Sequence, residues 1–149
     1  DGDKSPDILL ADGFLGLRLC RNKKTAAVAG GLKMGPWLLA GPFDNTEGKG
    51  FATAYPPEKD PDLSKEYTGK NNEKVAWKKT EFPDGQVNSL RVFKPECNDN
   101  AAAYLYREIE APAAAELPVS LGSDDTLSVW LNGEPLAAEN VARGCAPER

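Results

Sequence analysis

Two adjacent carboxylates, Asp124 and Asp125, are the residues of this chain whose type and spacing best fit chemistry. Neighbouring carboxylates concentrate negative charge, and they repel each other unless a cation or hydrogen-bond donors compensate. Calcium takes about six to eight oxygen ligands and could use such a pair. Three interpretations are open: a turn in which one carboxylate accepts backbone N–H groups, a calcium site, or the edge of a sugar-binding site.

The carboxylates stand directly before a predicted β-strand. Apolar and other side chains alternate from residue 126 to 132, with Leu127, Val129 and Leu131 on one face. The strand ends at Asn132-Gly133, and this dipeptide favours a two-residue hairpin turn because both positions need φ > 0. We therefore predict a β-hairpin over residues 126–138, with Asp124 and Asp125 at its entrance.

Two aromatic residues are candidates for stacking on a sugar ring. Trp77 is followed by two lysines, so we expect it to be partly exposed, and Tyr55 lies in a long polar segment over residues 44–67. Long loops in compact domains are often functional, and the acidic oxygens of this one could complete a site. The alternative is that aromatic side chains fill the core, as we expect for Trp37 in its apolar run.

The elements that would position these residues are short strands. The 12 Pro and 14 Gly in 149 residues suit a fold rich in turns. The apolar patterns predict an antiparallel β-sandwich, an all-β fold. Strands are expected within residues 9–20 (two strands around a turn), 35–43, 75–80, 87–93, 103–109 and 117–121.

Composition excludes several function classes. The chain has no histidine, which removes Ser-His-Asp and Cys-His catalysis and His-ligated zinc or haem. A net charge of −5 disfavours binding to nucleic acid. No apolar run is long enough to predict a membrane-spanning helix. The three cysteines, Cys20, Cys97 and Cys145, allow one disulfide in three ways and lack metal-ligand spacing.

Domain organisation is predicted in two parts. Residues 1–30 form an N-terminal extension that is either a linker or a set of edge strands. Residues 31–149 form the β-sandwich, whose last strands could be incomplete. The chain opens Asp-Gly-Asp without Met, which is typical of a mature product or a fragment.

An ordered series of motifs is similar to a known kind of module. The motifs are Trp37-Leu38-Leu39-Ala40-Gly41-Pro42-Phe43, Gly50-Phe51, Tyr55-Pro56-Pro57-Glu58, Ala103-Tyr104-Leu105-Tyr106, Gly122-Ser123-Asp124-Asp125 and Val129-Trp130-Leu131-Asn132-Gly133. Their order resembles the galactose-binding-like jelly roll of large secreted planctomycete-type proteins, which also carry cytochrome c domains. The segment 123–133 also resembles the matching strand of PA14-like domains.

This resemblance implies a non-catalytic module outside the cytoplasm, periplasmic or secreted. In the adhesin branch of the PA14 family an Asp-Asp pair binds calcium at the sugar site, and Asp124 and Asp125 fall at that position. Calcium is thus the one cofactor that the resemblance suggests. The implied ligand is a carbohydrate, with Asp124, Asp125, Trp77 and Tyr55 as its binding residues.

Two other function classes compete with carbohydrate binding. A structural domain would pack against neighbouring domains of a redox or hydrolase assembly and bind no small ligand. A carboxylate glycosidase would need two carboxyl groups about 5–10 Å apart across a cleft, which adjacent residues need not provide. We therefore expect that the chain is not an enzyme.

Overall fold

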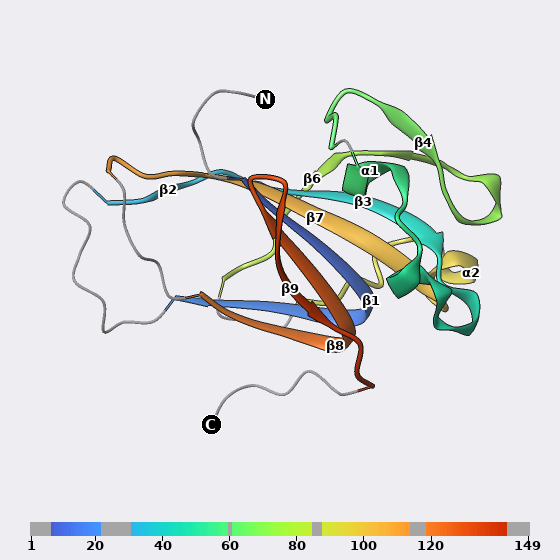
Figure 1. Ribbon diagram of the computed structural model, residues 1–149. Coiled ribbons are helices and arrows are strands. Elements are labelled where there is room, and N and C mark those ends of the chain that lie inside the picture. Colours follow the sequence, from blue (N-terminus) through green and yellow to red (C-terminus); the bar gives the residue numbers. More distant parts are fainter. Residues whose placement is uncertain (1–6, 22–30, 60, 85–87, 114–118, 143–149) are drawn as a thin grey trace.

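The computed structural model describes residues 7–21, 31–59, 61–84, 88–113 and 119–142, with the backbone alone over residues 7–21 and 119–120. Antiparallel strands dominate it (Figure 1). The strands are β1 (Asp7–Arg21), β2 (Lys33–Met34), β3 (Trp37–Asp44), β4 (Glu66–Thr68), β5 (Lys74–Ala76), β6 (Lys78–Thr80), β7 (Ala101–Glu110), β8 (Val119–Leu131) and β9 (Glu134–Glu139). The helical turns are α1 (Pro56–Lys59), α2 (Pro95–Asn98), η1 (Thr46–Ala52) and η2 (Lys70–Asn72).

These strands form a seven-stranded sheet and a separate β4–β5 pair. The main sheet runs β6-β3-β7-β1-β8-β9, and β2 pairs with the end of β7. Every recorded strand pair is antiparallel, which confirms the all-β prediction. The β-sandwich and jelly-roll parts of that prediction stay predictions.

β7 lies inside the sheet and is buried on both faces. Its residues 101–106 are all buried, although their side chains point alternately to opposite sides. Leu105 belongs to one hydrophobic cluster and Tyr104 to another. Tyr104 and Tyr106 therefore lie on one face of the strand and Leu105 on the other.

A bulge in β3 gives the second cluster its central aromatic ring. Ala40 pairs with Tyr104 and Phe43 with Ala102, so β3 uses one residue more than β7 between these pairs. In a regular strand Ala40 and Phe43 would face opposite sides. The extra residue, next to the cis Gly41-Pro42 bond, turns both toward the second cluster.

Different segments cover the two faces of the sheet. Leu90 is buried in the first cluster, where Phe82 and Phe93 pack against it from the chain between β6 and β7. Tyr67 and Val75 of the β4–β5 pair are buried in the second cluster, where Tyr55 joins them. The main sheet is therefore the middle layer of the described fold.

β1 and β8 form one bent ribbon. β8 uses one residue more than β1 between the pairs Asp12–Leu127 and Phe14–Asp124. β1 then uses two residues more before the pair Arg18–Gly122. Figure 1 shows both strands bending sharply in their middle, as bulged strands do. Leu121 lies in the part of β8 before the bend and packs against the first cluster. This part of β8 therefore helps to cover the face of the sheet on which the first cluster lies.

The predicted hairpin over residues 126–138 is confirmed. Leu131 pairs with Glu134, which leaves Asn132 and Gly133 as a two-residue loop. Their φ angles are 53° and 79°, as a type I′ turn requires. Leu127 and Val129 are buried in the first cluster, whereas Trp130 packs against the second.

Several local predictions need correction. Residues 9–20 belong to one long strand, β1, rather than to two strands and a turn. As far as Asp12 this strand pairs with β7 on one side and β8 on the other, and beyond the bend its recorded pairs are with β8. Residues 88–93 form no strand; they cover the sheet face with Leu90 and Phe93. The strand expected at 75–80 is divided between β5 and β6. The segment 44–67 contains η1, α1 and part of β4.

Candidate functional site

Asp124 and Asp125 lie inside β8 at the bend, rather than before the strand begins. Both are half-buried. Asp125 has φ of 70°, in the left-handed region where Asp is more tolerated than most residues. The hydroxyl of the buried Ser123 donates to the Asp125 carbonyl at 3.3 Å. The bend itself is therefore one physical reason for an aspartate at residue 125.

Among the residues whose side chains are described, no three His, Cys, Asp or Glu side chains are placed to hold a metal ion. Calcium needs several oxygens beyond two carboxylates. Calcium binding by Asp124 and Asp125 stays a prediction.

Tyr55 serves in packing. Its ring stacks on Phe43 with centroids 5.0 Å apart, and its hydroxyl donates to the backbone carbonyl of Asp44. Burial raises the pKa of the Tyr55 phenol, so the hydroxyl stays protonated and remains a donor. The ring face against Phe43 is closed to a sugar.

Trp77 is partly exposed, as predicted, but its ring packs edge-on against Tyr106 with centroids 5.9 Å apart. Its indole N–H is buried and has no hydrogen-bond partner among the described residues. Trp37 is fully in the core, with 3% of its surface exposed. Trp130 packs against the same cluster as Trp77. The tryptophans thus serve chiefly as fillers of the two clusters.

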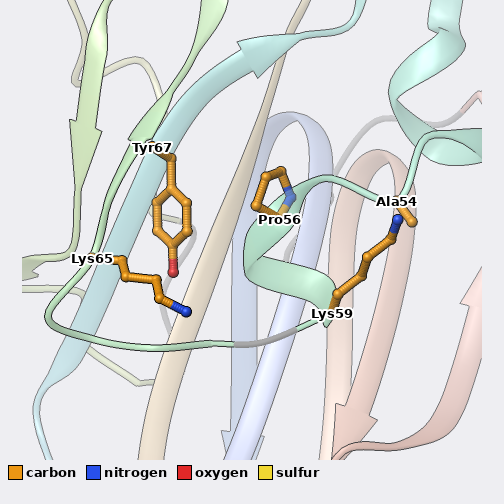
Figure 2. A pocket seen from close by; sticks show the side chains of 5 residues that line it. All are labelled: Ala54, Pro56, Lys59, Lys65 and Tyr67. Carbon is orange, nitrogen blue, oxygen red and sulfur yellow. The ribbon is translucent and has the colours of Figure 1, made fainter.

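A cavity lies elsewhere, between α1 and β4. Its volume is about 350 Å³, and Ala54, Pro56, Lys59, Lys65 and Tyr67 line it. Figure 2 shows Lys65 and Tyr67 on one side of it, and Pro56 and Lys59 on the other. None of the four predicted binding residues is in this lining.

The wall formed by α1 is held to the sheet at two adjacent residues. Pro57 is fully buried. Glu58 accepts a hydrogen bond from the Tyr104 hydroxyl at 3.1 Å, and its own N–H donates to the Tyr55 carbonyl at 3.0 Å. Burial, and then the charge of Glu58, raises the pKa of Tyr104, so this phenol stays a donor. Because these contacts fix α1, Lys59 is presented at the cavity.

The opposite wall is held by β4 and the turn before it. Tyr67 pairs with Val75 across the small sheet, and its hydroxyl donates to the Asp62 carbonyl at 3.0 Å. The Asp62 carboxylate accepts from the Ser64 N–H at 2.9 Å and the Ser64 hydroxyl at 2.7 Å. The Ser64 bonds, followed by the charge of Lys65, lower the pKa of Asp62. This turn sets the place where Lys65 reaches the cavity.

Among the described residues of the lining, the charged ones are Lys59 and Lys65, and Tyr67 and Pro56 supply apolar surface. Lys65 also lies 3.5 Å from the Asp62 carboxylate, in a pair that is substantially exposed to water. Sequence reasoning emphasised the acidic oxygens of this segment and missed its lysines. The available signal was Pro56-Pro57, which restricts the backbone before Glu58 and Lys59.

Comparison with known proteins finds no matching family model, curated protein or solved structure. The resemblance to galactose-binding-like and PA14-like modules therefore stays a prediction. No helix in the described parts of the chain is long and apolar enough to cross a membrane. Cys97 is a buried free thiol, whereas the side chains of Cys20 and Cys145 lie outside the described residues.

Proposed function

We propose that this chain is a non-catalytic carbohydrate-binding module of a larger extracytoplasmic protein. The observation that carries this proposal is the cavity between α1 and β4. Its volume of about 350 Å³ is at the small end of ligand sites, which run from roughly 300 to 1,000 Å³. The site would hold a small ligand or one end of a glycan against Pro56 and the small part of Tyr67 that reaches the cavity, since the rest of the Tyr67 side chain is buried in the second cluster.

The construction of the two walls supports binding. Each wall is tied to the strands through buried groups, Pro57 and Glu58 on one side and Tyr67 on the other. A preformed cavity needs little ordering when a ligand enters, which lowers the cost of binding. Cavity binding also places the ligand away from Asp124 and Asp125, so it does not require calcium.

A glycan array probed with the whole chain tests this function. Oligosaccharides that bind should then be titrated by calorimetry, with Tyr67→Ala as the cavity variant. Tyr67→Phe is its matched control, because it keeps the ring that would face the sugar. We expect Tyr67→Ala to abolish binding and Tyr67→Phe to retain most of it. Equal affinity of the parent chain and a folded Tyr67→Ala variant would place the sugar elsewhere.

An interaction domain is the second candidate, and β9 favours it. This strand is at the edge of the main sheet, and all six of its residues are exposed. Leu136 within it is 60% exposed. Edge strands can pair with another chain or domain. This function predicts that amide exchange in β9 is slower when the chain is part of a larger protein than when it is alone.

A further inference from the structure

We infer that copies of this chain associate head to tail, with β9 of one copy pairing antiparallel with β6 of the next. β6 and β9 are the two ends of the main sheet, and within the described parts of the chain no strand pairs with the outer edge of either. An unpaired edge is a template for another strand. This contact goes beyond the proposed carbohydrate function and does not depend on a ligand in the cavity.

The directions of the two edge strands suit this contact. Every neighbouring pair along the order β6-β3-β7-β1-β8-β9 is antiparallel. Because an odd number of antiparallel steps leads from β6 to β9, the two strands run in opposite directions. A second copy in the same orientation, placed beside the first, therefore brings its β6 antiparallel to β9 and continues the alternation of the sheet.

Only part of β9 is regular enough to pair. β9 has one residue more than β8 between the pairs Val129–Ala137 and Trp130–Pro135, so it contains a bulge. A bulge interrupts the ladder, and a proline lacks the N–H donor that pairing needs. The regular part of β9 is therefore residues 137–139.

This regular part matches β6 in length and charge. β6 also has three residues, Lys78–Thr80. Antiparallel pairing of the two segments places Lys78 opposite Glu139 and Thr80 opposite Ala137. The lysine and the glutamate are both exposed. Opposite charges at directly opposed positions stabilise a strand pair.

Lys78 and Glu139 also lie on the same face of the sheet. Residues directly opposite each other in a strand pair share a face. Glu139 pairs with Leu127, and Lys78 pairs with Leu39. Both leucines are buried in the first cluster. In a sheet continued from one copy to the next, the carboxylate and the ammonium group are therefore neighbours on one face.

The charges disfavour pairing between like edges. Full antiparallel pairing of β9 with a second β9 would place Glu134 opposite Glu139. The same pairing of β6 with a second β6 would place Lys79 opposite the Lys79 of the other copy. Like charges directly opposite destabilise a strand pair. The edges thus favour the head-to-tail contact over the symmetric ones.

Sedimentation velocity on the parent chain tests the association over a wide range of concentrations. A contact of three residues per strand is small, so we expect a dissociation constant on the order of 0.1–1 mM. The mean sedimentation coefficient should rise with concentration, and less so in high salt. A parent chain that stays monomeric at about 1 mM in low salt would overturn the inference.

Four variants test the register. Lys78→Glu and Glu139→Lys each place like charges at the contact. Lys79→Glu is the control for the first, because Lys79 pairs with Leu38 and lies on the other face. Glu134→Lys is the control for the second, because Glu134 lies beyond the bulge. Each control alters the net charge as much as its counterpart, and urea unfolding would show that all four variants are folded.

We expect Lys78→Glu and Glu139→Lys each to weaken association about fivefold or more, and each control to stay within about twofold of the parent chain. An equimolar mixture of Lys78→Glu and Glu139→Lys should associate like the parent chain, because each mixed contact again joins opposite charges. Association that is unchanged by Lys78→Glu would overturn the head-to-tail contact, and with sensitivity to Glu139→Lys it would indicate pairing between two β9 strands instead.

Discussion

Because of the bend in the β1–β8 ribbon, we predict that substitution by glycine affects stability differently at the adjacent residues Asp124 and Asp125. Asp125 has φ of 70°, whereas Asp124 pairs with Phe14 in the ladder and is not in the left-handed region. If the bend is the main reason for Asp125, glycine should be tolerated there, because glycine adopts positive φ without a steric cost. The same substitution at Asp124 places glycine in a strand, where it is unfavourable.

The magnitudes follow from the backbone. Asp125→Gly should change the free energy of unfolding by less than about 0.5 kcal/mol. Glycine removes the steric cost of positive φ in the folded chain, and this gain offsets the greater conformational entropy that glycine gives the unfolded chain. Asp125→Ala should cost about 1 kcal/mol, because alanine has a Cβ and no side-chain oxygen to support the left-handed conformation. Asp124→Gly should cost roughly 0.5–1 kcal/mol. For a chain of this size, 1 kcal/mol corresponds to a Tm change of about 2–4 °C.

The assay is urea unfolding followed by tryptophan fluorescence, repeated with EDTA and with excess calcium. If Asp125 is a calcium ligand, the parent chain should gain stability in calcium by mass action. Both Asp125→Gly and Asp125→Ala would then lose that gain equally. We expect backbone conformation to set the stabilities, so that Asp125→Gly is clearly more stable than Asp125→Ala without additions, with EDTA and with excess calcium. Equal costs of glycine at residues 124 and 125, or no cost of Asp125→Ala, would refute the reasoning.

Three further predictions concern the contacts that hold the sheet and its covering segments. Gly69→Ala should destabilise the chain by about 1–3 kcal/mol in urea unfolding, because a Cβ there would collide with the Pro42 carbonyl and Val75 Cγ2. No change in the urea midpoint would show that the β4–β5 pair can shift away. Arg107→Lys should cost about 1–2 kcal/mol by the same measurement, because Arg107 binds both Asp84 oxygens at 2.9 Å and lies 5.0 Å from the Trp37 ring centroid. Lysine does not reproduce this geometry. Lys33→Arg, in an exposed ion pair, is the control. Hydrogen bonds from Lys49 and Thr46 hold the pKa of Asp44 well below its usual value, so the stability this carboxylate contributes is present above pH of about 4 and is lost as the pH falls toward the lowered pKa. Asp44→Asn should therefore show a shallower loss of Tm between pH 4 and 2 than the parent chain, and parallel curves would contradict that assignment.

The sequence predicts best those strands whose alternation of apolar and polar residues and whose turn residues are local to the strand itself. The 126–138 hairpin follows from a two-residue alternation and from Asn132-Gly133, a dipeptide that favours the positive φ angles this turn needs. A strand was also expected within residues 103–109, where β7 lies, although its burial on both faces was not visible in the sequence. The strand predicted at 87–93 does not form over the described residues 88–93, because Leu90 and Phe93 are apolar for another reason: they cover a face of the sheet.

The candidate site was less predictable than the fold. Asp124 and Asp125 were conspicuous as neighbours in sequence, but the register of β1 against β8 gives Asp125 a conformational role. Trp77 and Tyr55 could equally have been exposed or buried, and packing against Tyr106 and Phe43 decided the matter. The lysines at the cavity are six residues apart in a polar segment and carry no periodic signal.

The sequence by itself determined the all-β class, the hairpin turn and the exclusion of histidine chemistry, because each depends on residue type or on spacing within one strand. The tertiary structure alone decided that the first part of β1 lies between β7 and β8, that β8 bends at the two aspartates, and that Lys59 and Lys65 share a cavity. These features arise from pairing and packing between segments far apart in the chain. A local pattern does not fix them, since the same alternation is compatible with many partners and registers.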